Sequence, residues 1–338
     1  MERRKLDKEN TVILTLALGI LLVTIVSCSK VNDNLADSEN RPETVSGKQG
    51  KFVAVGVTEE AAYSIDGIDW FKAKMPADKV WETVCYGNGK FVAVAWDSDI
   101  AAYSDDGINW TATTLPYEAK WLSVCYGNGK FAAVADGSNK AAYSDDGVNW
   151  TGTILPYEAE WGSVCYGNGK FAAAAHDSNK AAYSTDGIKW TKARLPYEAN
   201  WIAICYGKDK FVAVASDNKA AYSVDGIKWK KAILPYIGYW SRVSYGNDKF
   251  VATRSLHVLR NLEYKAAYSD DGIKWKEARM PKGPWWQSIC YGNGKFVAVA
   301  WTLSDRNKGA YSEDGINWAT TKLGQIKTKL LSVCYGGD

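Results

Sequence analysis

The chain has 338 residues, a formal net charge of +3 and an aromatic composition, with 16 Trp and 20 Tyr but only 8 Pro. Its length allows two domains, although one closed array of repeats can use nearly all of it. The charge is close to balanced, and Lys and Asp are spread along the sequence, which excludes the clustered basic surface of a nucleic-acid-binding protein.

The N-terminal residues predict an export signal rather than part of the fold. A short basic start is followed by a charge-free, mostly apolar run, Thr11–Val26, and then by Cys28. This order resembles a bacterial lipoprotein signal, in which residues 1–27 are removed and Cys28 receives lipid. The alternative is an uncleaved anchor, but the run is shorter than the roughly 20 residues that a membrane span needs. We expect an exported protein whose lipidated Cys28 and polar tether, 28–49, hold it at a bacterial membrane.

The region 50–338 repeats one phrase, Tyr-Ser-x-Asp-Gly-x-x-Trp, seven times. Its Trp recurs at intervals of 40, 40, 40, 39, 46 and 43 residues, so the region is an array of one small structural unit. Because an Asp side chain can accept backbone N–H groups inside a turn, and seven equal copies suit packing better than chemistry, we interpret the Asp residues as structural. They are Asp66, Asp106, Asp146, Asp186, Asp225, Asp271 and Asp314.

Each repeat predicts four antiparallel β-strands. In the copy that begins at Trp121, aromatic and β-branched residues predict strands over 121–126 and 130–135, joined by a turn at Asn128-Gly129. A variable loop over 136–140, a third strand over 141–144 and a fourth strand over 149–153 complete the unit. Four antiparallel strands that recur at this period predict an all-β fold, the β-propeller, with one repeat in each blade.

The two ends of the array predict how it closes. A seventh inner strand, Leu330–Tyr335, stands at the C-terminus, whereas the first unit begins with its second strand, Lys51–Val55. These two fragments complete each other, so we expect the C-terminal strand to join the N-terminal blade. The result is a closed ring of seven four-stranded blades without a large exposed sheet edge, and therefore a monomer.

The repeated phrases resemble the Asp-box repeats of the propeller superfamily that includes sialidases and photosystem-assembly proteins. The resemblance covers 50–338, but Asp and Gly are adjacent here, so each hairpin is one residue shorter than in the usual box and a side branch is indicated. The resemblance implies the propeller fold and a structural role for the box in the turn between the third and fourth strands. A sialidase also needs an Arg cluster, a Tyr–Glu nucleophile pair and an Asp acid. The repeats hold few Arg residues and no Arg-Ile-Pro segment before the first box, so the resemblance does not imply that activity.

Variation between the repeats indicates the binding face. The loops between second and third strands differ in every repeat, whereas the hairpins of the opposite rim are nearly identical. Variable loops on a constant scaffold are the usual place for ligand contacts. The sixth of these loops is expanded, over 254–265. The candidate ligand-binding residues on this rim are Trp96, Asp97, Asp136, His176, Arg254, His257 and Trp301.

Six Trp residues begin inner strands at equivalent positions, and two interpretations are open. The set comprises Trp81, Trp121, Trp161, Trp201, Trp240 and Trp286. Near the mouth of a central channel, Trp121, Trp161 and Trp201 would offer aromatic platforms for a sugar or a peptide. The other interpretation, which we favour, is packing between blades against the preceding Leu-Pro-Tyr segments.

Cysteine and histidine usage gives no chemical centre. One Cys lies on each inner strand except the sixth, and equivalent positions around a ring do not single out partners for disulfides, whose Cβ atoms must approach to about 3.8 Å. We therefore expect six free, poorly accessible thiols. The two histidines, His176 and His257, form no metal-ligand pattern, and no Gly-x-Ser-x-Gly segment occurs. No metal, cofactor or catalytic set is expected.

The sequence therefore favours a non-enzymatic, membrane-tethered propeller that binds an unidentified protein or glycan through its variable rim. Two alternatives stay open. One is an assembly factor for a membrane complex, as among the photosystem-type relatives. The other is a carbohydrate-active enzyme, which needs two carboxyl groups about 5 Å or 6.5–9.5 Å apart. Its carboxylates would come from Asp97, Asp99, Asp136, Asp177 or Glu263.

Overall fold

The computed structural model describes residues 49–255, 265–282, 285–301, 308–321, 323 and 326–337, all of them in the unit Val45–Asp338. The predicted signal sequence, Cys28 and all of the tether except Gln49 lie outside these residues, as do His257 and Glu263. Every regular element of the described residues is a β-strand, and neighbouring strands pair antiparallel. None of the described residues forms a helix long and apolar enough to cross a bilayer.

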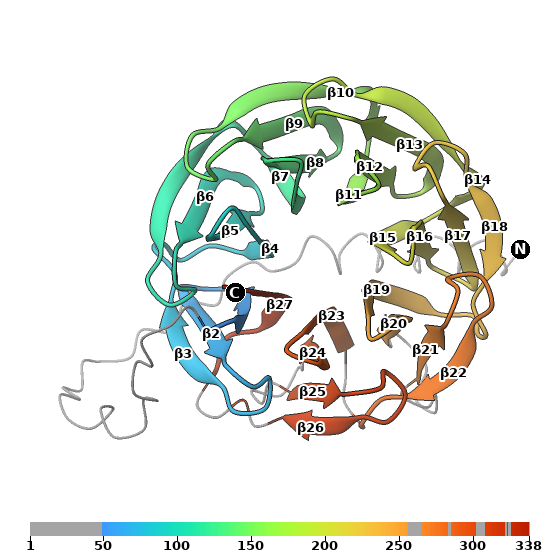
Figure 1. Cartoon of the computed structure of the whole chain (residues 1–338). Coiled ribbons are helices and arrows are strands. Elements are labelled where there is room, and N and C mark those ends of the chain that lie inside the picture. Colours follow the sequence, from blue (N-terminus) through green and yellow to red (C-terminus); the bar gives the residue numbers. More distant parts are fainter. Residues whose placement is uncertain are drawn as a thin grey trace, which may run out of the picture. The chain divides into compact units, whose positions relative to one another are not determined.

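The strands form antiparallel arrays of four that run from an inner strand, near the centre of Figure 1, to an outer strand at its edge. One sheet has the order β27 (Leu330–Gly336), β1 (Lys51–Gly56), β2 (Glu60–Ser64), β3 (Phe71–Lys74). The next complete array has the order β11 (Trp161–Gly167), β12 (Lys170–Ala175), β13 (Ser178–Ser184), β14 (Thr191–Ala199). It is followed by β15 (Trp201–Gly207), β16 (Lys210–Ala215), β17 (Lys219–Ser223), β18 (Lys230–Ile233).

Two larger sheets are each made of two such arrays. The first comprises β4 (Trp81–Gly87), β5 (Lys90–Ala95), β6 (Ser98–Ser104), β7 (Thr111–Gly127), β8 (Lys130–Asp136), β9 (Ser138–Ser144) and β10 (Thr151–Ala159). The long β7 joins them, because its first part pairs with β6 and its last part with β8. The second comprises β19 (Tyr239–Gly246), β20 (Lys249–Ser255), β21 (Lys265–Ser269), β22 (Lys276–Arg279), β23 (Trp285–Gly292), β24 (Lys295–Trp301), β25 (Lys308–Ser312) and β26 (Ala319–Thr321). One pair, Ser255 with Trp285, links its halves.

The strands are longer than the sequence patterns predict at two places in the repeat. The predicted loop over 136–140 is a tight turn instead, because β8 continues to Asp136 and β9 begins at Ser138. The predicted fourth strand over 149–153 starts at Thr151 and continues as β10 to Ala159, whose partner is Ser138. The register shifts between Ile154 and Ala159, so the link to the next unit returns to the sheet after a bulge.

The phrase Ser-x-Asp-Gly builds the turn between third and outer strands through its own side chains. Oδ1 of Asp146 accepts the N–H groups of Val148 and Asn149, each at 2.8 Å, and the Ser144 hydroxyl at 2.9 Å. Oγ of Ser144 accepts the N–H of Gly147, whose φ of 73° lies in the left-handed region. The equivalent bonds to Oδ1 recur in all seven copies. Each Asp is therefore engaged within its own turn.

These hydrogen bonds make the turns sensitive to acid. Partial burial pushes the pKa of Asp314 up, but the N–H groups of Asn317 and Ile316 outweigh it and hold the pKa at about 2, below the ordinary 3.8. A lowered native pKa stabilises the fold above the unfolded-state pKa, and this contribution is lost as the pH falls through the native value.

We therefore expect Asp314→Ala to lower the free energy of unfolding by about 2 kcal/mol at neutral pH, with the difference shrinking between about pH 4 and pH 2. Urea unfolding at several pH values measures it. The neighbouring exposed Glu313 gives the control variant, Glu313→Ala, which is expected to have little effect. A pH-independent loss for Asp314→Ala would contradict the ionic origin of the contribution.

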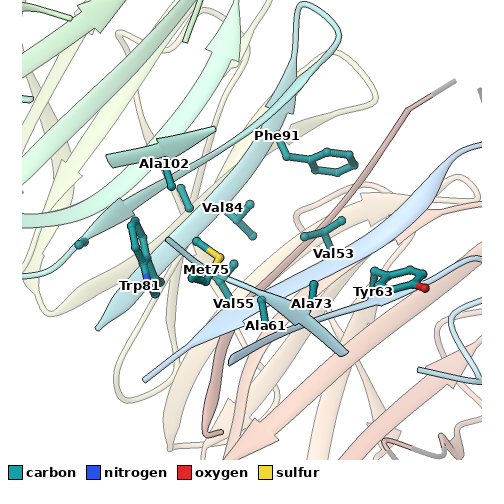
Figure 2. Close-up of a cluster of buried hydrophobic side chains, with 12 residues drawn as sticks. Val53, Val55, Ala61, Tyr63, Ala73, Met75, Trp81, Val84, Phe91 and Ala102 are labelled. Carbon is teal, nitrogen blue, oxygen red and sulfur yellow. The ribbon is translucent and has the colours of Figure 1, made fainter. Parts of the chain in front are cut away.

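The hydrophobic core lies between neighbouring arrays. In the cluster of Figure 2, Val53, Val55 and Met75 from one array lie beside Trp81 and Phe91 from the next. All of these side chains are buried. Burial on both faces explains why the second strands are nearly continuous apolar runs.

The inner strands also contact one another through a repeated Gly–Tyr pair. At Gly127, a Cβ atom would lie 1.9 Å from Cγ of Tyr166 on the next inner strand, so only Gly fits. The same contact joins seven pairs of inner-strand residues: Gly87–Tyr126, Gly127–Tyr166, Gly167–Tyr206, Gly207–Tyr245, Gly246–Tyr291, Gly292–Tyr335 and Gly336–Tyr86. The last pair links β27 to β4, and β27 also pairs with β1 over Lys51–Gly336 to Gly56–Leu330.

Candidate functional site

The inner Trp residues pack between arrays and are not ligand platforms. Trp121, Trp161 and Trp201 are 0% exposed, so a sugar or peptide cannot stack on them. The indole N–H of Trp121 donates to the carbonyl of Tyr117 at 3.2 Å, and the ring lies in a cluster with Leu115. The packing interpretation is confirmed, and the assignment of Trp121, Trp161 and Trp201 as candidate ligand-binding residues is wrong.

Arg254 also differs from the prediction. It lies within β20, opposite Trp240, rather than in an expanded loop, and its side chain is only 7% exposed. Its Nε lies against Gly238, where a Cβ atom would be 1.9 Å away. Arg254 is therefore removed from the exposed rim. His257 lies outside the described residues, and Trp301 ends β24 with a side chain that is not described.

The remaining rim candidates occupy equivalent tight turns after the second strands. Trp96 is half-buried beneath the Lys120 ammonium group, which lies 5.4 Å from the ring centre. Asp97 is exposed and takes a left-handed φ of 49°. Of the other carboxylates weighed for catalysis, Asp99 and Asp177 are exposed as well.

Asp136 and His176 come together with a residue that the sequence analysis did not select, Glu160. One donor atom from each side chain lies within 4.8 Å of the other two. Asp136 ends β8, His176 follows β12, and Glu160 stands between β10 and β11. We call these three residues the rim triad.

The backbone fixes two members of the rim triad relative to each other. The N–H of His176 donates to the carbonyl of Glu160 at 2.7 Å. The same bond occurs in two other repeats, from Trp96 to Val80 at 2.8 Å and from Ser216 to Asn200 at 2.9 Å. The scaffold is thus constant, and only the side chains at these two positions change from repeat to repeat.

The absence of a side chain at Gly162 leaves room for the imidazole of His176. At Gly162, the second residue of β11, a Cβ atom would lie 1.8 Å from Nε2 of His176. The equivalent residues of the other inner strands all carry a Cβ: Glu82, Leu122, Ile202, Ser241, Gln287 and Leu331. The same repeat therefore combines an unusual rim residue with the glycine that accommodates it.

Charged groups on the inner strands affect the pKa values of the rim triad. Burial lowers the pKa of His176, with the nearby Arg242 acting in the same direction and the Asp136 and Asp177 carboxylates opposing it. His176 is therefore neutral at neutral pH. The pKa of Glu160 is raised, first by desolvation and then by Asp136 and Asp177.

Two further charges interrupt the repeat on the inner strands. Arg242 on β19 stands where most other inner strands have Ser or Thr. Glu82 on β4 keeps some contact with solvent but is surrounded by protein, and this desolvation raises its pKa to about 7 although Arg242 lowers it. Because Arg242 acts on both Glu82 and His176, it lies within electrostatic reach of each of these ionisable groups.

The six cysteines of the described residues are free, as the sequence predicts. Burial raises the pKa of the thiol of Cys85 far above its ordinary value, and the other five shift in the same direction. Since the thiolate is the reactive form, this shift makes the half-buried thiols poorly reactive.

The rim triad could not be found from sequence motifs, because its members come from two neighbouring arrays. The usable signal was the set of repeat positions that hold a different residue each time, including Val80, Lys120, Glu160 and Asn200. Comparison of this position between repeats would have selected Glu160.

Comparisons with known proteins identify the fold. No protein-family model matches the sequence, and no curated protein matches it either. A virginiamycin B lyase of Staphylococcus aureus, a catalytically inactive variant with quinupristin, is similar in structure with a TM-score of 0.64 at 12% identity, over 83% of this chain and 90% of that one. A streptogramin B lyase gives 0.63 at 13% identity, over 84% and 91%.

YCF48 bound to a D1 peptide is also similar, with a TM-score of 0.57 at 12% identity over 84% of this chain and 88% of that one. Likeness at this level of identity shows the fold alone. The part of the chain that the structure describes is all-β, is built of four-stranded antiparallel arrays and has the β-propeller fold.

Proposed function

We propose that the chain is a non-enzymatic β-propeller, tethered to a membrane through lipidated Cys28, that binds a partner protein at its variable rim. The observation that carries the proposal is the convergence of repeat departures at one place. The rim triad, Gly162 and Arg242 all depart from otherwise similar repeats, and they lie within contact or electrostatic reach of one another. A purely structural array has no need to concentrate ionisable side chains in this way.

The propeller in this proposal has seven blades and closes on itself, as a side branch of the Asp-box type. The cyclic order of the Gly–Tyr contacts, in which Gly336 meets Tyr86, supports it. So does the pairing of β27 with β1. Closure leaves no large exposed sheet edge, and a monomer presents its rim to the partner.

A protein is favoured over a glycan by the nature of the exposed groups. Sugar binding through stacked rings needs accessible aromatic faces, but the inner Trp residues are buried and Lys120 covers Trp96. The rim instead offers carboxylates of Asp136, Glu160 and Asp177 beside the cations Lys120 and Arg242. Such mixed charge suits a partner with complementary ionic groups. The peptide-bound state of YCF48 is an analogy of fold alone.

Proximity labelling in the native membrane tests the proposal. The rim variant carries Asp136→Ala, Glu160→Ala and His176→Ala, and it is compared with the wild-type chain. The control carries Asp105→Ala and Asp145→Ala, which remove two carboxylates from the nearly identical hairpins of the opposite rim. We expect the same proteins to be labelled by the wild type and the control, and to lose at least about tenfold in labelling with the rim variant. Equal labelling by all three, or rim-dependent binding to a glycan array instead, would overturn protein binding.

A carbohydrate-active enzyme is the second candidate, because the pKa of Glu82 near 7 and a neutral His176 are suited to proton transfer at neutral pH. Turnover of an aryl-glycoside panel that disappears in Glu82→Gln or Asp136→Asn would favour it over the binding module. Turnover that survives both variants would mean that neither Glu82 nor Asp136 is needed for the activity.

A further inference from the structure

We propose that the rim triad, Asp136, Glu160 and His176, binds a divalent transition-metal ion of the Zn²⁺ class. The site would use one imidazole nitrogen and two carboxylate oxygens, with at least one coordination position left to water or to an incoming ligand. This proposal stands whether or not the rim binds a partner protein.

The donor set suits such an ion. Imidazole favours zinc and its neighbours in the first transition row, and three protein ligands with an open position are typical of accessible zinc sites. Two carboxylates neutralise a divalent charge.

The geometry requires the three donor atoms to move closer together. The three donor atoms lie within 4.8 Å of one another. A tetrahedral ion about 2.1 Å from each ligand holds its donors about 3.4 Å apart. Side-chain rotation closes this difference, because Glu160 is exposed and free to turn while the backbone of His176 and Glu160 is already held by a hydrogen bond of 2.7 Å.

An unsatisfied atom points independently to a missing ligand. Oδ1 of Asp136 is buried and accepts no hydrogen bond from any of the residues that the structure describes. A buried carboxylate oxygen without a partner is costly, and native proteins nearly always satisfy it. A cation at the rim triad would satisfy this oxygen.

Gly162 shows that the fold accommodates the imidazole of His176 specifically. Its missing side chain leaves the space in which Nε2 of His176 lies, and any other residue there would displace the ring. The equivalent positions in other repeats, such as Leu122 and Ile202, lack both the histidine and the glycine. Because Asp136 belongs to β8 and His176 follows β12, a bound ion would also connect two neighbouring arrays.

Co²⁺ titration of the full chain in detergent, after chelator treatment, tests the site. We expect saturable binding of one ion, d–d absorption without thiolate-to-cobalt charge transfer, and competition by Zn²⁺. His176→Ala and Asp136→Asn are expected to weaken binding more than about tenfold. Gly162→Leu, which keeps all three ligands, should weaken it as well because the leucine displaces the imidazole.

Asp97→Asn is the matched control, since Asp97 occupies a rim turn with a left-handed φ of 49° that Asn tolerates. This variant should bind Co²⁺ as the wild type does, and thermal unfolding should shift upward with metal in both. No saturable binding, binding unchanged by His176→Ala, or a thiolate charge-transfer band would overturn the proposal. A variant that loses partner labelling but still binds metal would leave the metal site standing and would bear only on the proposed partner binding.

Discussion

Gly336→Ala is expected to lower the free energy of unfolding by about 3 kcal/mol, although it adds only one methyl group. The added Cβ would lie 2.0 Å from Cγ of Tyr86, and Cδ1 and Cβ of the same side chain follow at 2.4 and 2.5 Å. Tyr86 cannot easily retreat, because its ring packs on Phe91 at a centroid distance of 4.7 Å. The clash must separate β27 from β4, and with it the two ends of the array.

Urea unfolding, followed by Trp fluorescence, measures the loss. Gly127→Ala makes the same clash with Tyr166 inside the chain and should cost about as much, if the terminal contact is equivalent to the internal ones. Gly129→Ala is the control: its surroundings are open, and its φ of 75° alone predicts a loss of about 1 kcal/mol. A Gly336→Ala variant as stable as the wild type, beside a damaged Gly127→Ala, would argue against a closed ring.

The repeat made most of the fold predictable. Asn128-Gly129 predicts a two-residue hairpin, and both residues do take positive φ, 48° and 75°. The partner of the C-terminal strand followed from counting which strand the first unit lacks, and Phe52 lies opposite Tyr335 as Phe250 lies opposite Tyr245. Such inferences are reliable because the same residues recur at equivalent positions in several repeats.

The site was less predictable, for a physical reason. Whether a Trp packs or binds depends on what covers it, and the covering residues lie on a neighbouring array. Likewise, the relation of His176 to Glu160 and Gly162 comes from the pairing of β11 with β12. Arg254 was misplaced because the sixth repeat continues its second strand through a charged residue, where five other repeats have Ala and the first has Gly56.

Glu82→Gln is expected to raise the free energy of unfolding by about 3 kcal/mol at about pH 8.5, while changing it little at pH 4.5 and below. Desolvation on β4 raises the native pKa from 4.5 to about 7, against the attraction of Arg242. The native state therefore holds this proton more tightly than the unfolded chain does. Stability falls as the pH rises from about 4.5 to about 7 and stays low above it, because the ionised carboxylate is poorly solvated in the fold.

A Gln side chain has the shape of the protonated form without the charge, so the variant removes the cost of ionisation alone. Thermal and urea unfolding at both pH values give the comparison, and Glu118→Gln, at an exposed position, should show no pH-dependent gain. Arg242→Met should widen the difference, because it removes the cation that favours the Glu82 carboxylate. A gain of equal size at both pH values would mean that Gln packs better rather than that the carboxylate is strained. No gain at about pH 8.5 would mean that solvent reaches Glu82 freely, and the charged groups of the inner strands would then be no more than surface residues.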